Sequence, residues 1–177
     1  MRIARPAGCH SCLTAKDFVR LSSDPEITAR LVDRLRSAGI EFRRLEHAVV
    51  FTSAEAAAVR GTPLASGAKA LVCKADGEFL MFVLPADRKL ASKSVRAARG
   101  WKSLRFADKE ELRNLTGLEP GAVPPLGSLF GLKTLCDRRL ADQATINFNA
   151  GAHAISISMT YDDYARIEQP ELGEFAE

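Results

Sequence analysis

The residues best suited to chemistry lie in three short segments of the chain. Lys69 stands directly before an apolar run, residues 121–127 read Gly-Ala-Val-Pro-Pro-Leu-Gly, and residues 149–153 read Asn-Ala-Gly-Ala-His. Glycine lacks a Cβ, so another molecule can approach the main chain closely at these points. Main-chain amides exposed in this way can donate hydrogen bonds to the oxyanion that forms during ester hydrolysis. A lysine at the entrance of a strand can hold a phosphate or a carbonyl as a point charge.

Each polar side chain near these segments also has an ordinary structural explanation. Lys69 could be a solvated lysine at a strand end. His153 could donate to a substrate or line a pocket, or it could cap a strand end with its ring hydrogen-bonded to the backbone. His47 is expected to hydrogen-bond within a loop or to border the pocket, and Thr52 is first of all a helix N-cap. No Gly-x-Ser-x-Gly sequence is present, so the motifs indicate no protein nucleophile.

Capping and turn signals predict the elements that would position these residues. Asp24-Pro25-Glu26 starts an amphipathic helix, with Pro25 at the first helical position, and the helix ends at Gly39. Asp76-Gly77 predicts an antiparallel hairpin, because this dipeptide accepts the backbone angles of a tight turn. The hairpin strands are expected at residues 70–72 and 79–84, the other strands at 40–45, 101–106, 129–135, 144–148 and 154–159, and the other helices at 52–61, 88–99, 108–117 and after Thr160.

This order of elements predicts a single domain of the mixed α/β (α+β) class. Helices and strands interleave without the regular alternation of a doubly wound fold. We therefore expect a mixed, mostly antiparallel sheet or a partly closed barrel, with helices packed around it. A length of 177 residues with 46% apolar residues suits one core. Residues 1–22 show no clear periodicity and are expected to form a peripheral arm, which leaves residues 23–177 as the domain.

The charges are nearly balanced in number but unevenly distributed. Lys and Arg number 25 against 22 Asp and Glu, and the net charge of +3 does not by itself indicate a nucleic-acid-binding protein. Residues 88–105, however, contain seven cations and no acid. This run could contact a phosphate backbone, or it could be an ordinary solvated helix face. Binding that weakens steeply with salt would distinguish the two.

The cysteines and the apolar runs indicate a cytoplasmic protein without disulfides. No apolar stretch is long enough to cross a bilayer, and residues 1–6 lack the apolar centre of a secretory signal. Cys73 and Cys136 lie in apolar runs and are expected to be buried free thiols. Cys9 and Cys12 have the spacing of half a zinc site or of a redox pair, but no second pair of ligands follows, so no metal site is expected.

Four motifs in the same order resemble those of the YbaK and prolyl-tRNA synthetase-associated editing domains. They are residues 47–57 with His47, Thr52 and Glu55, the Lys-x-Leu-Val element at residues 69–72, the Gly-x-x-Pro-Pro-x-Gly loop at residues 121–127, and Asn-Ala-Gly at residues 149–151. The resemblance covers about residues 24–168. The pocket is expected where the strand that starts at Lys69, the 121–127 loop and the 149–153 turn meet.

The resemblance implies a free-standing deacylase that hydrolyses the ester of mischarged tRNA. Alanine carried on the proline tRNA is the first choice of substrate, and cysteine, serine and threonine esters are the others. In this family a lysine holds the tRNA end, loop amides polarise the ester and a hydroxyl of the terminal ribose helps to activate water, so no cofactor or metal is implied. The residues assigned at the pocket are, for catalysis, Lys69, Gly121, Gly127, Gly151 and His153, and for substrate binding, His47, Thr52, Val123, Pro124, Asn149 and Ala150. The basic run at residues 88–105 adds Arg88, Lys89, Lys93 and Arg96 for tRNA binding.

The expected partner is the aminoacylated 3′ end of tRNA, with a synthetase as a further candidate partner and no membrane. A monomer or a weak homodimer is expected. The alternative hypothesis is a non-catalytic module of the same fold that binds tRNA or another nucleic acid, or that acts as a regulator. The intact Lys69 and glycine loop argue against the regulator.

Overall fold

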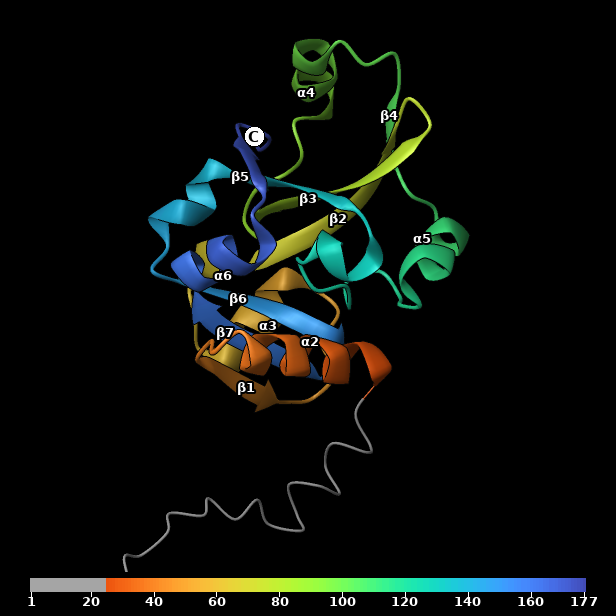
Figure 1. Cartoon of the computed structure of the whole chain (residues 1–177). Coiled ribbons are helices and arrows are strands. Elements are labelled where there is room, and N and C mark those ends of the chain that lie inside the picture. Colours follow the sequence, from red (N-terminus) through yellow and green to blue (C-terminus); the bar gives the residue numbers. More distant parts are fainter. Residues whose placement is uncertain (1–24) are drawn as a thin grey trace, which may run out of the picture.

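The computed structural model describes residues 25–177, which form five α-helices and eight strands (Figure 1). The strands make two sheets, one of three strands in the order β1-β7-β6 and one of five in the order β4-β2-β3-β5-β8. The predicted mixed α/β class is confirmed. Within residues 25–177 the strands divide between two sheets and do not close into a barrel.

The three-stranded sheet is antiparallel throughout. It consists of β1 (Phe42–Glu46), β6 (Thr145–Ala152) and β7 (Ile155–Thr160). Helix α2 (Glu26–Ser37) lies against this sheet and buries Leu31 and Leu35 in the core (Figure 1). Ile155, Ile157 and Met159 of strand β7 are all buried as predicted, but Ser156 between them is buried too, so burial does not alternate strictly along the strand.

The five-stranded sheet is built on the predicted hairpin. Strands β2 (Ala68–Ala75) and β3 (Glu78–Pro85) pair antiparallel around Asp76 and Gly77, which have φ values of 47° and 97°. Strand β4 (Leu104–Phe106) pairs antiparallel with β2. Strands β5 (Lys133–Asp137) and β8 (Glu171–Gly173) are added in parallel on the other edge, which makes the sheet mixed.

Local capping chemistry explains where most of the remaining helices begin. They are α3 (Ser53–Arg60), α4 (Ser92–Arg99), α5 (Lys109–Thr116) and α6 (Tyr161–Glu168), with short 3-10 turns at Leu64–Ser66, Gly127–Phe130 and Arg138–Asp142. The side chains of Thr52, Asp108 and Thr160 accept hydrogen bonds from main-chain amides of the first turns of α3, α5 and α6. Thr52 and Asp108 each form a complete capping box with the glutamate three residues later, Glu55 and Glu111.

The two sheets meet where β2 begins. An isolated parallel bridge joins Gly67 to Asn147 of β6. A Cβ on Gly67 would lie 2.7 Å from the Cβ of Ala86, so the chain after β3 packs directly on this point. The junction therefore places the start of β2, the middle of β6 and the loop after β3 next to one another.

Several boundaries differ from the sequence predictions. Pro25 is the N-cap of α2 and not its first helical residue. Helix α4 begins at Ser92, so Arg88 and Lys89 belong to the loop before it, where Lys89 N–H donates to the carbonyl of Glu177. The stretch 129–135 is not one strand, because a 3-10 turn and Gly131, at φ 69°, precede β5.

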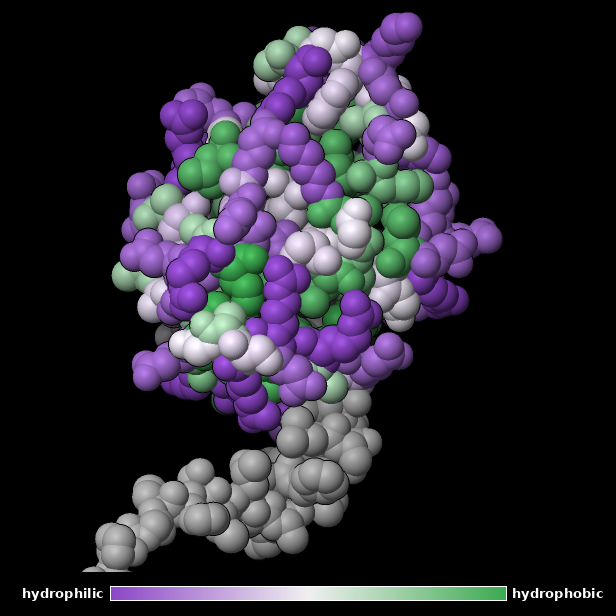
Figure 2. Space-filling view, viewed as in Figure 1, coloured by the Kyte–Doolittle hydropathy of each residue, from purple (hydrophilic) through white to green (hydrophobic). Residues whose placement is uncertain are grey.

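The predicted arm at residues 1–22, with Cys9 and Cys12, lies outside the described residues. Within residues 25–177, Cys73 and Cys136 are buried free thiols as predicted. Burial raises the pKa of each thiol to about 12. No helix in this part of the chain is long and apolar enough to cross a membrane. Hydrophilic side chains cover most of the face shown in Figure 2, with apolar ones in patches between them.

Candidate active site

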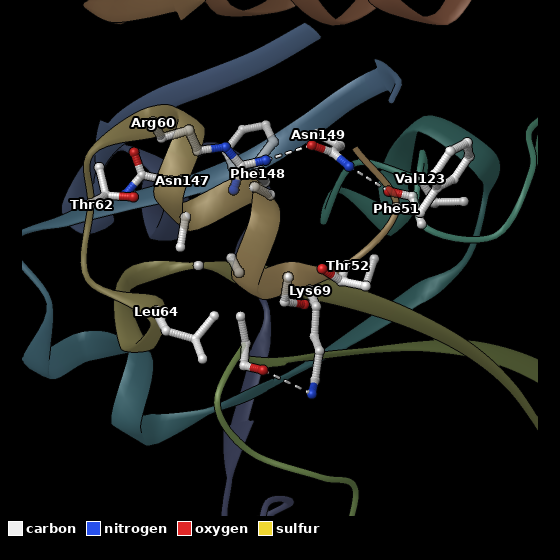
Figure 3. A pocket seen from close by; sticks show the side chains of 18 residues that line it. Phe51, Thr52, Arg60, Thr62, Leu64, Lys69, Val123, Asn147, Phe148 and Asn149 are labelled. Atoms are coloured by element: carbon white, nitrogen blue, oxygen red, sulfur yellow. Dashed lines mark hydrogen bonds between the residues drawn. The ribbon is translucent and has the colours of Figure 1, made fainter. Parts of the chain in front are cut away.

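A cleft of about 90 Å³ lies at the junction of the two sheets, beside helix α3 (Figure 3). Five of the residues predicted from the sequence line it, and they come from the segments that were expected to meet. They are Thr52, Lys69, Gly121, Val123 and Asn149. The other residues predicted for catalysis or substrate binding do not line it; these are His47, Pro124, Gly127, Ala150, Gly151 and His153.

Lys69 lies at one edge of the cleft, opposite Arg60 and Asn149 (Figure 3). Its ammonium group donates to the carbonyl of Ala86 at 3.3 Å and to the carbonyl of Arg88. Burial lowers the pKa of Lys69, and the nearby Asp87 carboxylate partly offsets this effect. The structure therefore holds a partly buried cation at the rim of the cleft, with neutral carbonyls as its hydrogen-bond partners.

The start of the glycine loop, residues 121–127, is fixed by strand β6. Asn149 Nδ2 donates to the carbonyl of Gly121 at 2.8 Å, and the amide of Gly151 donates to the carbonyl of Ala122 at 3.0 Å. The amides of Gly121 and Val123 have no acceptor within residues 25–177. Both residues line the cleft, and their two main-chain donors are not used by the described part of the chain.

The other end of the glycine loop is buried. The amide of Gly127 donates to Thr134 Oγ1 at 3.1 Å, and Thr134 Oγ1 donates to the Glu168 carboxylate. A Cβ on Gly127 would lie 2.7 Å from the carbonyl oxygen of Leu132. The expectation that Gly127 exposes its amide to a substrate is therefore wrong, since this glycine allows close packing of the loop on β5. Pro124 is also buried outside the cleft.

The Asn-Ala-Gly segment likewise serves the fold. The pairing of β6 with β7 shifts register between Asn149 and Ala152, and Gly151, at φ 95°, lies in this bulge. Thr28 Oγ1 of helix α2 donates to the carbonyl of Ala150 at 2.5 Å, and a Cβ on Gly151 would meet the Thr28 amide nitrogen at 3.1 Å. Ala150 and Gly151 therefore allow the helix to approach closely, and only Asn149 of this segment reaches the cleft.

His153 lies behind the glycine loop. A Cβ on Gly121 would lie 3.0 Å from Cε1 of His153, so the ring packs directly against this glycine. The other side of the ring contacts Phe51, with the ring centroids 5.1 Å apart. His153 Nδ1 is buried and has no hydrogen-bond partner within the described residues. Phe51 itself lines the cleft and is 76% exposed, so a large aromatic face lies at the rim.

Arg60 is a cleft residue that the sequence analysis missed. Its Nη2 donates to Asn149 Oδ1 (Figure 3), and its Nε donates to Ser156 Oγ at 2.8 Å. Ser156 Oγ also contacts His47 Nε2 at 2.7 Å, and His47 Nδ1 lies 2.7 Å from the carbonyl of Ala48. In a neutral His47 this network places the proton on Nδ1, because Nδ1 must donate to a carbonyl. His47 therefore supports the network outside the cleft.

Two more features of Arg60 are relevant to the chemistry. Burial lowers its pKa to about 10, so the guanidinium remains charged near neutral pH. It forms no ion pair with a carboxylate of the described residues. Arg60 is the last helical residue before Gly61. This position indicates only that its positive charge stabilises the C-terminal end of the helix dipole.

The basic segment begins at the edge of the cleft, where Arg88 supplies a carbonyl to Lys69, and continues into helix α4. Within residues 25–177, the guanidinium of Arg99 pairs with Glu171 and that of Arg105 with Glu111. The side chains of Lys89, Lys93 and Arg96 have no ion-pair partner in this part of the chain. Three of the four predicted tRNA-binding cations are therefore available to a ligand.

The lining of the cleft indicates which reactions it can perform. It contains two cations, two free main-chain amides and several hydroxyl groups, and none of the lining residues is Asp, Glu, His or Cys. No group of three or more His, Cys, Asp or Glu in residues 25–177 could hold a metal ion. The lining thus supplies oxyanion donors and positive charge without a general base or a thiol. This combination is typical of a hydrolase whose substrate is an already activated ester.

Comparison with known proteins identifies the family within this class. Residues 47–167 match the aminoacyl-tRNA editing domain family. The chain is 35% identical over 151 residues to the multifunctional Ser/Thr-tRNA deacylase ProXp-y of Escherichia coli, covering 82% of this chain and 90% of that protein. It is 28% identical over 153 residues to a proline–tRNA ligase of Acidithiobacillus ferrooxidans, covering 84% of this chain and 25% of the ligase.

A solved structure has the same fold. It is titled a putative trans-editing enzyme for prolyl tRNA synthetase, and it superposes with a TM-score of 0.76 at 23% identity, covering 88% of this chain and 99% of that one. The chain belongs to the aminoacyl-tRNA editing family, and it is a hydrolase that acts on aminoacyl-tRNA ester bonds. The resemblance seen in the motifs is therefore confirmed.

Proposed function

We propose that the protein is a free-standing deacylase that hydrolyses seryl and threonyl esters of tRNA in trans. The observation that carries this proposal is the cleft itself, which is lined by Lys69 and by Gly121 and Val123, whose amides have no acceptor among the described residues. The match to a Ser/Thr-tRNA deacylase over 90% of that protein's length supports a free-standing enzyme.

The reaction follows from the groups that the cleft provides. Water adds to the carbonyl carbon of the ester, and the negative charge that develops on the carbonyl oxygen is stabilised by the amides of Gly121 and Val123. The bond to the ribose oxygen then breaks, and a proton from the attacking water passes to that oxygen. Because the lining has no general base, the neighbouring ribose hydroxyl of the substrate assists the water.

Hydroxyl groups in the cleft favour serine and threonine as the amino acid. Thr52, Ser53 and Thr62 supply these hydroxyl groups to the lining, whereas the carboxamide of Asn147 is buried and bonded to Ser66 and Ser158. A site that hydrogen-bonds a substrate hydroxyl can discriminate strongly against an analogue that lacks it. The alanyl ester on the proline tRNA, which was the first choice from the motifs, stays a prediction, and the similarity to proline–tRNA ligases justifies testing it.

The rim of the cleft is suited to the end of a tRNA. The exposed ring of Phe51 offers a surface on which a base can stack. Lys69 lies at the same cleft, and further positive charge is supplied by Lys89 in the loop before α4 and by Lys93 and Arg96 in that helix. Phosphates of the acceptor stem would follow this direction, and binding would therefore weaken as salt increases.

A deacylation panel tests the proposal. Purified protein is mixed with tRNAs charged with serine, threonine, alanine or cysteine, including alanine on the proline tRNA, and loss of the ester is followed. We expect the seryl and threonyl esters to be hydrolysed fastest. Lys69→Ala should remove most of this activity with an unchanged unfolding midpoint, and Lys69→Arg should retain part of it. Binding of tRNA without hydrolysis of any ester would instead support the non-catalytic module.

A further inference from the structure

The environment of Arg60 in the cleft is unusual for a charged side chain. It is a half-buried cation whose side-chain partners within residues 25–177 are the neutral groups of Asn149 and Ser156. Removing a charge from water is unfavourable, and an acidic partner usually compensates for it. Because Arg60 has no such partner among the described residues, its position calls for a different explanation from structural ion pairing.

The donor and acceptor roles in the hydrogen bonds between Arg60, Asn149 and Gly121 provide that explanation. A guanidinium group can only donate, so Asn149 must turn its Oδ1 toward Arg60. The amide nitrogen Nδ2 then has to face the carbonyl of Gly121, to which it donates at 2.8 Å. If the carboxamide were reversed, Oδ1 would face the Gly121 carbonyl, and two acceptors would oppose each other. Arg60 thus selects the only orientation of Asn149 that holds the glycine loop.

A second contact keeps Arg60 in place. Its Nε donates to Ser156 Oγ, which is also bonded to His47. The guanidinium is therefore held on two sides, and the chain of contacts runs from His47 through Ser156, Arg60 and Asn149 to the carbonyl of Gly121. It ends beside the two amides that have no acceptor in the described structure.

We propose that Arg60 is a positioning residue for ester hydrolysis, which fixes the carboxamide of Asn149 and through it the amides of Gly121 and Val123. This inference rests on the proposed function, in which those amides receive the oxyanion. It assigns Arg60 no contact with the reacting atoms. Its loss should therefore lower kcat with little effect on KM, since the geometry around the transition state changes while binding of the tRNA remains.

Two variants and one matched control test the kinetic consequence. Arg60→Met removes the donors, and Asn149→Asp keeps the shape and gives Arg60 an acidic partner but has no N–H to offer Gly121. Each should lower kcat by about a hundredfold, the effect expected for a misplacement of about 1 Å, with KM near the wild-type value. Arg60→Lys should restore part of kcat. Arg36→Met removes an exposed arginine of α2 outside the cleft and should leave both constants unchanged.

Two kinetic outcomes would overturn the inference. A raised KM with an unchanged kcat in Arg60→Met would show that Arg60 contacts the tRNA directly. Wild-type kinetics in either Arg60→Met or Asn149→Asp would show that the loop does not depend on this contact.

Amide hydrogen exchange tests, without an activity assay, whether Arg60 fixes the glycine loop. In Arg60→Met and Asn149→Asp the amides of Ala122 and Gly151, which donate to the carbonyls of Glu119 and Ala122, should exchange faster than in Arg36→Met, because the loop has lost its fixed partner. Equal exchange in all the variants would overturn the positioning role. If the wild-type protein hydrolysed no aminoacyl-tRNA, the proposed function would fail, and this readout would still decide whether Arg60 fixes the loop.

Discussion

Replacing Gly121 with alanine places a methyl group at the point where the glycine loop meets the cleft. Gly121 has a φ of 88°, and an ideal Cβ there would lie 3.0 Å from Cε1 of His153 and 3.7 Å from its Nδ1. The left-handed conformation costs an L-residue about 1–2 kcal/mol. The contact with His153 adds a displacement of a few tenths of an ångström, which the loop or the ring must absorb.

Gly117→Ala is the matched control for this change. Gly117 has a φ of 72°, and a Cβ there would meet nothing within 4 Å. Both variants should therefore lose about 1–2 kcal/mol of unfolding free energy in urea titrations. Only Gly121→Ala should also lose deacylation activity, by about a hundredfold in kcat, because it alone displaces the amides that face the substrate.

The comparison between the two variants can refute the reasoning. If Gly121→Ala kept wild-type kcat, the amides of the loop would not need their observed position. If Gly117→Ala lost as much activity as Gly121→Ala, the loss would follow from reduced stability and not from the geometry of the cleft.

Three further predictions concern other parts of the structure. Phe51→Ala should raise KM for aminoacyl-tRNA and leave kcat nearly unchanged, because stacking on an exposed ring contributes about 1–3 kcal/mol to binding of a base. Gly127→Ala should lower the unfolding free energy by about 1–3 kcal/mol, measured by urea titration, since the new Cβ would overlap Thr134 and the main chain of Leu132. Alkylation at pH 8, followed by mass mapping, should leave Cys73 and Cys136 unmodified in the native protein, since a pKa of about 12 leaves about 1 thiolate in 10,000.

Each of these predictions has its own control. Val59→Ala removes an exposed apolar side chain of α3, the helix that follows Phe51, and should not change KM. An equal effect of the two substitutions would contradict the stacking role of Phe51. A stable Gly127→Ala protein without activity would argue for a catalytic role of that glycine. Both thiols should react fully once urea unfolds the protein, and fast modification in the native state would contradict their burial.

Local signals in the sequence predicted much of the fold. The capping residues Thr52, Asp108 and Thr160 and the turn at Asp76-Gly77 act within a few residues of their own position, so their effect is visible without tertiary information. Residues 129–135 were predicted as one strand because they are apolar. Packing of Gly127 on Thr134 instead requires a 3-10 turn before β5, and no local pattern reveals that contact.

The site was predictable only where a residue belongs to a motif. Lys69, Gly121 and Asn149, which the motifs singled out, line one cleft, but the motifs did not distinguish glycines at the cleft from glycines that permit close packing. That distinction depends on partners far away in the sequence, such as Thr28 for Gly151. Arg60 was missed for the same reason, since its partner Asn149 is 89 residues away.

The central claim is that main-chain amides of the glycine loop receive the oxyanion. A crystal structure with a non-hydrolysable amide analogue of seryl-adenosine tests it directly. The account predicts that the carbonyl oxygen of the analogue lies at the oxyanion position, about 2.7–3.1 Å from the amide nitrogens of Gly121 and Val123. An analogue whose carbonyl points away from these amides, or which binds outside the cleft, would contradict the account.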